Sequence, residues 1–149
     1  MADTWQSLID PEAEFDFMNI DIHGIDEGTI LGAPTLPDVH SKIFEWLSGR
    51  VVVCRTHFDR VALGRANMRY QLPAISCQWL DSARVARRAW EAVSTKGYGL
   101  RNVCDMLGYR FQQHHALEDA KAAGFVVLSA INGSGLDLET WIARLNQPI

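Results

Sequence analysis

The chain has 149 residues, of which 48% are hydrophobic and 21% charged, and its formal net charge is −4, as in an ordinary globular protein. It contains no apolar run of roughly 18 residues and no signal-like core, which excludes a membrane-spanning or secreted class. Cys54, Cys77 and Cys104 each lie in an apolar context, so we expect free thiols, a cytoplasmic location without membrane contact, and a single domain over residues 1–149.

The charge is distributed unevenly along the chain. Residues 50–110 hold eleven basic and four acidic side chains, a net +7, whereas the remainder carries −11. An arginine-rich middle suits contact with a phosphate backbone, and the acidic flanks argue against broad nonspecific DNA binding. Arg84, Arg87 and Arg88 have helical spacing and form the best candidate patch, the alternative being arginines scattered over solvated helix faces.

Hydrophobic periodicity and turn residues predict, in the first half, a strand over 4–9, a turn-rich stretch over 12–34, a helix over 37–48, a strand over 50–54 and a helix over 58–69. Pro37 suits the first turn of its helix and Gly49 its end. In the second half, the same signals predict a strand over 74–77 and helices over 82–93, 99–108, 116–131 and 137–145. Ser82 and Asp137 are the expected caps of two of these helices. The alternation indicates one α/β domain.

The most informative motif is His114-His115-Ala116-Leu117-Glu118-Asp119-Ala120. His114 and Asp119 flank the predicted start of the helix over 116–131, where backbone N–H groups and the helix dipole favour an anion such as phosphate. The alternative is that both are solvated or capping residues, which are common at helix starts.

A second segment supports the presence of a ligand-binding site. Val51-Val52-Val53-Cys54 is predicted to be a short buried strand, and Arg55-Thr56-His57-Phe58-Asp59 follows it. A carboxylate just beyond a buried strand lies where open α/β sheets bind their ligands. Asp59 is therefore a candidate site residue, while Phe58 is expected to pack in the core.

In this order, the motifs resemble those of the DnaQ-like 3'–5' exonucleases, the DEDDh group of the ribonuclease H-like superfamily. The other matching pieces are Ile22-His23-Gly24-Ile25, Gly32-Ala33-Pro34, Tyr98-Gly99-Leu100 and Leu107-Gly108, so that the resemblance covers nearly the whole chain. It implies a ribonuclease H-like α/β fold, with a mixed sheet flanked by helices. It also implies hydrolysis of nucleic-acid phosphodiesters at the 3' ends of single-stranded DNA or RNA.

The resemblance further implies a two-metal site for Mg²⁺ or Mn²⁺, in which one ion activates the attacking water and the other stabilises the leaving oxygen. Asp59 and Asp119 match the third and fourth carboxylate ligands. His114, two positions before the motif alanine, matches the general base better than His115 does. The residues expected near the substrate are His23, Gly24, Arg55 and His57.

The chain departs from the family at its N-terminus. The family's first two carboxylates come as Asp-x-Glu on the first strand, whereas Trp5–Pro11 matches the third strand and only four residues precede it. We therefore expect a fold that lacks two strands and has an open edge beside the strand over 50–54. Three resolutions stay open: a fragment, a homodimer or other partner that covers the edge, or replacement of the missing acids by Asp10 and Glu12. Pro11 disfavours replacement because it cannot donate to a strand ladder.

Three functions follow from this reading. The preferred one is a DEDDh-type exonuclease that is weak or inactive as the chain stands, because two carboxylates hold two cations poorly. The alternatives are an inactive nucleic-acid-binding remnant of the fold and a protein-interaction subunit that uses the open edge.

Overall fold

A computed structural model describes residues 3–93 and 97–147 of the protein. The elements along the chain are α1 (Phe17–His23), α2 (Leu36–Leu47), β1 (Val51–Cys54), α3 (Phe58–Arg69), β2 (Gln78–Asp81), α4 (Ser82–Ala89), α6 (Leu100–Met106), α7 (Ala116–Ser134) and α8 (Leu138–Leu145). β1 and β2 pair in parallel, with Val51 opposite Gln78 and Cys54 opposite Asp81. Parallel strands need a crossover connection, and α3 provides it. The predicted α/β class is confirmed, although the sheet formed by the described residues has two parallel strands.

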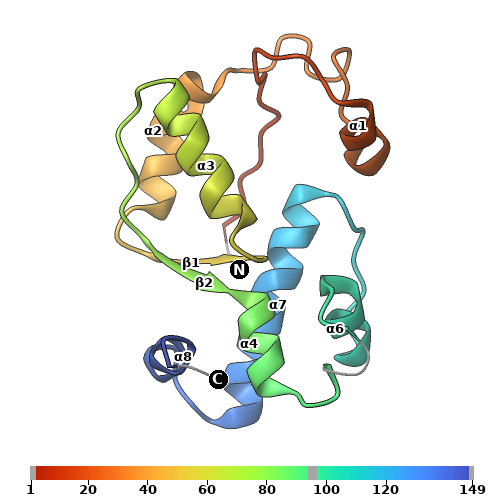
Figure 1. The fold of residues 1–149 in the computed structure, drawn as a ribbon, viewed down its shortest axis with the longest axis vertical. Helices are drawn as coiled ribbons and strands as arrows, with labels where there is room; N and C mark the ends of the chain where they lie inside the picture. Colours follow the sequence, from red (N-terminus) through yellow and green to blue (C-terminus); the bar gives the residue numbers. More distant parts are fainter. Residues whose placement is uncertain (1–2, 94–96, 148–149) are drawn as a thin grey trace.

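The sheet lies at the middle of the molecule, with α2 and α3 on one side of it and α4 and α8 on the other, while α7 runs past the sheet from one side to the other (Figure 1). α7 packs against β1, α4 and α6. Its buried side chains recur at helical spacing and are Ala122, Ala123, Val126, Val127 and Ala130. Gly135, with a φ of 68°, ends the helix in the left-handed conformation. No helix in the described ranges is long and apolar enough to cross a membrane.

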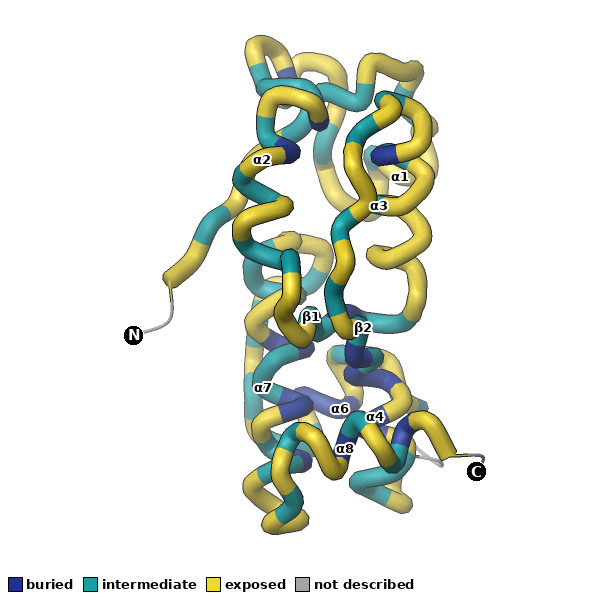
Figure 2. The backbone as a smooth tube through the Cα atoms, turned by 90° about the vertical axis from the view of Figure 1, so that its left-hand side faces the viewer, coloured by how far each residue is buried: buried dark blue, intermediate teal, exposed yellow. Residues whose placement is uncertain are grey.

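Burial is concentrated in one half of the molecule. The buried residues gather around α4, α7 and α8, whereas the half that contains α1, α2 and α3 is mostly exposed (Figure 2). Two apolar clusters meet along α7, one containing Leu80 and Trp141 and the other Val103 and Cys104. Trp141 is 1% exposed, and its Nε1–H donates to Ser134 Oγ at 3.1 Å. The polar edge of this large side chain is therefore satisfied inside the core.

The predicted strand over residues 4–9 is wrong. A strand needs a hydrogen-bonded neighbour, and the structure pairs none of the described residues with this segment. Asp10 instead forms an isolated parallel bridge with Thr35, and its N–H donates to Pro34 O at 2.8 Å. Trp5 packs against α2, with 6.4 Å between its ring centroid and that of Trp46.

The helices predicted over 37–48, 58–69, 99–108 and 137–145 are confirmed as α2, α3, α6 and α8. The stretch over 12–34 contains α1, a helix that was not predicted because turn-forming residues surround it. β2 lies at 78–81 rather than 74–77, because the side chain that fills the core is Leu80, 2% exposed. Asp81, not Ser82, caps α4 by accepting the N–H of Ala83 at 2.8 Å, and this helix ends at Ala89. α7 continues past Ile131, since no left-handed residue interrupts it before Gly135.

The arginines of the candidate patch on α4 make contacts within the chain. The Arg84 guanidinium donates to Leu145 O, and Arg88 donates to the carbonyls of Arg144 and Gln147. These carbonyls belong to the C-terminal end of α8, where backbone acceptors lack partners within the helix. Arg87 lies over the ring of Tyr98, with 3.6 Å between its Cζ and the ring centroid. The three arginines thus make contacts within the chain, and Arg84 and Arg88 cap α8.

We predict that Arg88→Ala lowers the free energy of unfolding by about 1 kcal/mol, because the carbonyl of Gln147, just beyond α8, loses its guanidinium donor and that of Arg144 keeps only backbone N–H partners. Arg65→Ala removes an exposed arginine from α3 and should change this free energy by less than ~0.5 kcal/mol. Denaturant titration followed by tryptophan fluorescence measures both. Equal stability of the two variants would contradict the capping role of Arg88.

Candidate active site

Asp59 stands at the junction of β1 and α3. β1 ends at Cys54, a three-residue turn follows, and Asp59 lies in the first turn of α3. The N–H of Arg55 donates to Asp59 Oδ2 at 3.3 Å, so the backbone after the strand orients this carboxylate. Asp59 itself is exposed to solvent. The strand end thus presents an acidic group at the surface, as the sequence predicted.

Asp119 occupies the same position on a different helix. It lies in the first turn of α7, and its N–H donates to His115 O at 2.9 Å. His115 is the N-cap residue of α7, and His114 precedes it with a φ of 62°. His114 is exposed and Asp119 is half-buried. Two carboxylates therefore project from the first turns of two helices.

The two carboxylates influence each other electrostatically. Partial desolvation raises the pKa of Asp59, and the negative charge of Asp119 raises it further. Desolvation also raises the pKa of Asp119, while His114, through its charge and its backbone hydrogen bond, and then His115 act in the opposite direction. Asp119 thus interacts electrostatically with both Asp59 and His114.

The donor set suits one hard cation better than two. Two repelling carboxylates beside open solvent offer oxygen ligands to an ion such as Mg²⁺, which commonly binds one or two carboxylates and keeps waters for its other positions. Among the described residues, however, no group of three or more His, Cys, Asp or Glu side chains is arranged to hold a metal ion. The residues present therefore do not fit the two-metal arrangement that the resemblance implied.

Asp10 and Glu12 do not fill the missing positions. The guanidinium of Arg69 donates to Pro11 O at 3.0 Å and to Glu12 O at 2.9 Å, which ties this segment to the C-terminal end of α3. Asp59 lies at the opposite end of the same helix, roughly 15 Å away at 1.5 Å per residue. The replacement hypothesis is therefore wrong in this structure, because the segment stays with Thr35 and α3 instead of entering the sheet.

The residues expected near the substrate are scattered. Arg55 is half-buried, and desolvation lowers its pKa; its electrostatic neighbours include Cys104 and Arg87, which places the guanidinium toward α4 and α6. Its Nη1 is buried without a hydrogen-bond partner in the part of the chain described. Arg55 therefore contributes to the candidate site through its backbone N–H, which contacts Asp59, rather than through its side chain. His57 lines a separate cavity of about 220 Å³ together with Arg60.

His23 and Gly24 lie at the end of α1. The N–H of Ile25 donates to His23 Nδ1 at 3.0 Å, and Gly24 closes the helix with a φ of 69°. These contacts are local, so a substrate role for either residue stays a prediction. Phe58 is 71% exposed, which corrects the expectation that it packs in the core. It instead leaves an aromatic side chain at the surface directly before Asp59.

Backbone strain marks the two junctions that carry the site, and sequence reasoning missed it. Thr56 and His114 both have a φ of 62°, a conformation that is rare for non-glycine residues and costly for a β-branched one. Thr56 is held there because its N–H donates to Asp81 Oδ1 at 3.0 Å. A threonine directly after a strand gives no signal of this in the sequence, since the hydrogen-bond acceptor comes 25 residues later.

Comparisons with known proteins identify the family of the chain. The chain matches the RNase_T family, described as exonuclease, over residues 2–126. The PolC-type DNA polymerase III of Caldanaerobacter subterraneus subsp. tengcongensis is 23% identical over 132 residues, which cover 88% of this chain and 9% of that protein. Its counterpart from Streptococcus thermophilus is 29% identical over 126 residues, or 83% of this chain and 8% of that protein. The chain thus spans less than a tenth of the length of these relatives.

The solved structure of exonuclease X in complex with 5' overhanging duplex DNA is similar with a TM-score of 0.68 and 19% sequence identity. The likeness covers 93% of this chain and 79% of that one, and at this identity it shows the fold. With a family match over most of its length, the chain belongs to the exonuclease family and has the DnaQ-like, ribonuclease H-like fold that its motifs predicted.

Proposed function

We propose that the protein is a DEDDh-type 3'–5' exonuclease domain that hydrolyses phosphodiesters at the 3' ends of single-stranded DNA or RNA. The observation that carries this proposal is the electrostatic interaction of Asp119 with Asp59 and with His114, the two carboxylates being in the first turns of two helices. Family membership supports the reaction class. Asp59 and His114 are exposed to solvent, so the end of a long polymer could reach them.

Each residue has a chemical task in this proposal. His114 acts as the general base and removes a proton from the attacking water. Asp119 stabilises the resulting imidazolium, because its carboxylate already interacts with His114. Asp59 and Asp119 would hold one Mg²⁺ or Mn²⁺ ion, whose chemistry is to activate water and neutralise charge on the scissile phosphate. The N–H of Arg55 keeps Asp59 oriented toward this position.

Cleavage by the chain is expected to be slow. The described residues cluster two carboxylates, so a second cation beside the leaving oxygen would lack anionic ligands. The second candidate function is an inactive nucleic-acid-binding remnant of the same fold. The incomplete ligand set favours this alternative, because strand binding requires no metal pair.

We further propose one exonuclease-like domain over residues 1–149 and a cytoplasmic location. The family match over residues 2–126 supports the first. The free thiols Cys54, Cys77 and Cys104 support the second, because reducing compartments keep cysteines unpaired.

A homodimer is proposed at the open side of the sheet. In the described chain β1 pairs only with β2, which leaves one strand edge without a partner. Val51 on this strand is 37% exposed. Further apolar surface lies on the same half of the molecule, with Phe17 84% and Leu31 89% exposed. A second copy could cover both, because symmetric pairing of like surfaces is the commonest route to a dimer.

The reaction is tested with single-stranded DNA and RNA, labelled away from the 3' end, in Mg²⁺ or Mn²⁺. We predict slow, metal-dependent shortening that His114→Ala and Asp119→Asn reduce to background, since a general base alone contributes roughly 10²–10⁴-fold. Asp10→Ala is the matched control and should cleave like the unaltered chain.

Full activity in His114→Ala would refute the general-base assignment. Loss of activity in Asp10→Ala would restore the replacement hypothesis. Strand binding without any cleavage would favour the inactive remnant.

Stability should depend on the carboxylate pair in a defined direction. A carboxyl whose pKa is raised by folding stabilises the protein only while protonated, so this contribution is present at low pH and is lost as pH rises through the folded pKa. We predict that Asp119→Asn raises the free energy of unfolding by ~0.5 kcal/mol at neutral pH, allowing for solvent screening. The difference should shrink as pH falls.

Melting curves with and without Mn²⁺ complete this measurement. The ion should raise the melting temperature of the unaltered chain and leave that of Asp119→Asn unchanged, because a ligand stabilises only the state that binds it. A variant that is less stable than the unaltered chain at neutral pH would contradict the rise in the pKa of Asp119 through desolvation.

Self-association is measured by light scattering after gel filtration. We predict a dimer at micromolar concentration, and a monomer for Val51→Lys, because a lysine on an exposed strand edge opposes strand pairing. Leu128→Lys, at a position on α7 that is 59% exposed, is the control and should remain dimeric. A monomeric unaltered chain would rule out the proposed dimer.

A further inference from the structure

An open cavity of about 690 Å³ lies between α6 and the segment that leads to α7. Its lining residues are Arg101, Asp105, Gly108, Arg110 and Phe111, and we call it the α6 groove. Two arginines face one carboxylate there, so the groove carries a net positive charge. This charge suits an anionic ligand of extended shape.

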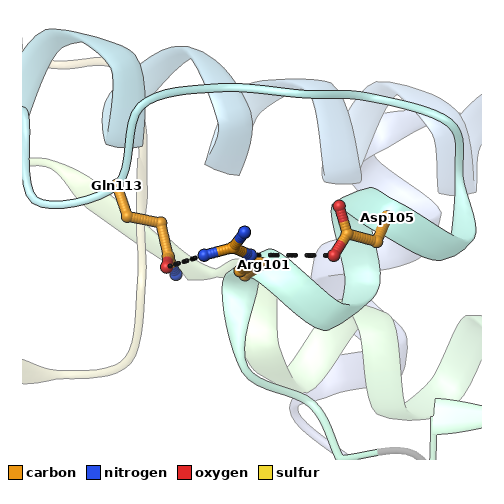
Figure 3. Close-up of polar contacts among 3 residues, drawn as sticks. All are labelled: Arg101, Asp105 and Gln113. Atoms are coloured by element: carbon orange, nitrogen blue, oxygen red, sulfur yellow. Dashed lines mark hydrogen bonds and ion pairs between the residues drawn. The ribbon is translucent and has the colours of Figure 1, made fainter.

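Arg101 is held in place on one wall of the groove. Its Nη1 donates to Gln113 Oε1 at 3.3 Å, and its Nε lies 3.8 Å from Asp105 Oδ2 (Figure 3). A guanidinium has five N–H donors, so these two contacts leave donors for a phosphate. The pair with Asp105 is exposed to solvent, which makes it easy for a second anion to compete for the arginine.

The groove leads directly to the candidate active site. Gln113, which contacts Arg101, is the residue before His114. Figure 3 shows the segment from α6 to Gln113 passing over the helix that carries Arg101 and Asp105. A strand lying in the groove would therefore pass close to the residue that precedes His114.

The other lining groups suit the repeating chemistry of a nucleic-acid strand. Arg110 is exposed and supplies a second cation. Phe111 is half-buried, with 6.2 Å between its ring centroid and that of Tyr109, so it is a fixed apolar wall. Grooves that bind single strands combine cations for the backbone with aromatic rings for the bases.

We propose that the α6 groove binds the phosphate backbone of a single-stranded nucleic acid whose 3' end lies at His114, with Arg101 and Arg110 contacting phosphates. This inference rests on the proposed exonuclease function and names its substrate track. Asp105 holds Arg101 in the free protein and competes with the incoming phosphate. Gln113 positions the same guanidinium on the side of the active site.

The test measures binding of fluorescently labelled single-stranded DNA and RNA of equal length, in EDTA so that no cleavage occurs, at several salt concentrations. Arg101→Ala and Arg110→Ala should each weaken binding several-fold at low salt and reduce the salt slope by about 0.7, the value for one phosphate contact on a single strand. Asp105→Asn should strengthen binding, because the competing carboxylate is removed.

Arg65→Ala is the matched control, since it removes one exposed arginine from α3, outside the groove. It should leave the salt slope unchanged. If Arg65→Ala weakened binding as much as the groove variants do, the effect would come from net charge alone and the proposal would be overturned. Failure of the unaltered chain to bind either DNA or RNA would also overturn it. Melting curves verify that each variant is folded, and comparison of the DNA and RNA arms identifies the preferred strand.

Cleavage by the unaltered chain, measured in parallel with Mn²⁺, separates this proposal from the exonuclease function. If the unaltered chain cleaved in a metal-dependent way while Arg101→Ala and Arg110→Ala bound the strand normally, the groove proposal would be wrong and the exonuclease proposal would stand. Weakened binding by these variants without cleavage by any form would support the groove and contradict the nuclease.

Discussion

The packing of α7 against β1 and α4 is the constraint on which the other features depend. The body of this helix contributes to both apolar clusters, and its first turn carries Asp119. Because one rigid element performs both tasks, the position of that carboxylate is set by side chains deep in the core. Val126, which is fully buried, thus influences the site without touching it. The opposite carboxylate depends on a four-residue strand, β1, that packs on the same helix.

The site itself opposes stability. Two acidic side chains repel each other, and two non-glycine residues, Thr56 and His114, hold left-handed backbone conformations at the junctions beside them. Such local costs persist only where surrounding structure enforces them, and here Asp81 does so by accepting the N–H of Thr56. Asp81 also caps α4, so one carboxylate supports a strained turn and a core helix together.

Much of this arrangement could be predicted from the sequence where the signal is local. Gly99 and Asp137 predicted the starts of α6 and α8, and the order of motifs indicated Asp59, Asp119 and His114 as the candidate site. Sequence patterns led to wrong or incomplete predictions where the interacting residue lies far away in the sequence. Residues 4–9 have the pattern of a strand, but the described residues offer them no strand partner. Arg84 and Arg88 resemble a phosphate patch, but they bond to acceptors 61 and 56 residues later in the chain. Arg55 was expected near the substrate, although its side chain is half-buried.

The uneven distribution of buried side chains has a consequence for motion. Regions with few buried contacts open at lower free energy than the core, so hydrogen exchange should be fast in residues 3–47 and slow in α4 and α7. Asp119 is carried by α7, whose later turns form part of this core, whereas Asp59 begins α3, whose residues are mostly exposed. The distance between Asp59 and Asp119 therefore depends on how α3 is held against α7. A bound strand or ion that bridges them would slow exchange in both helices as well as at the site.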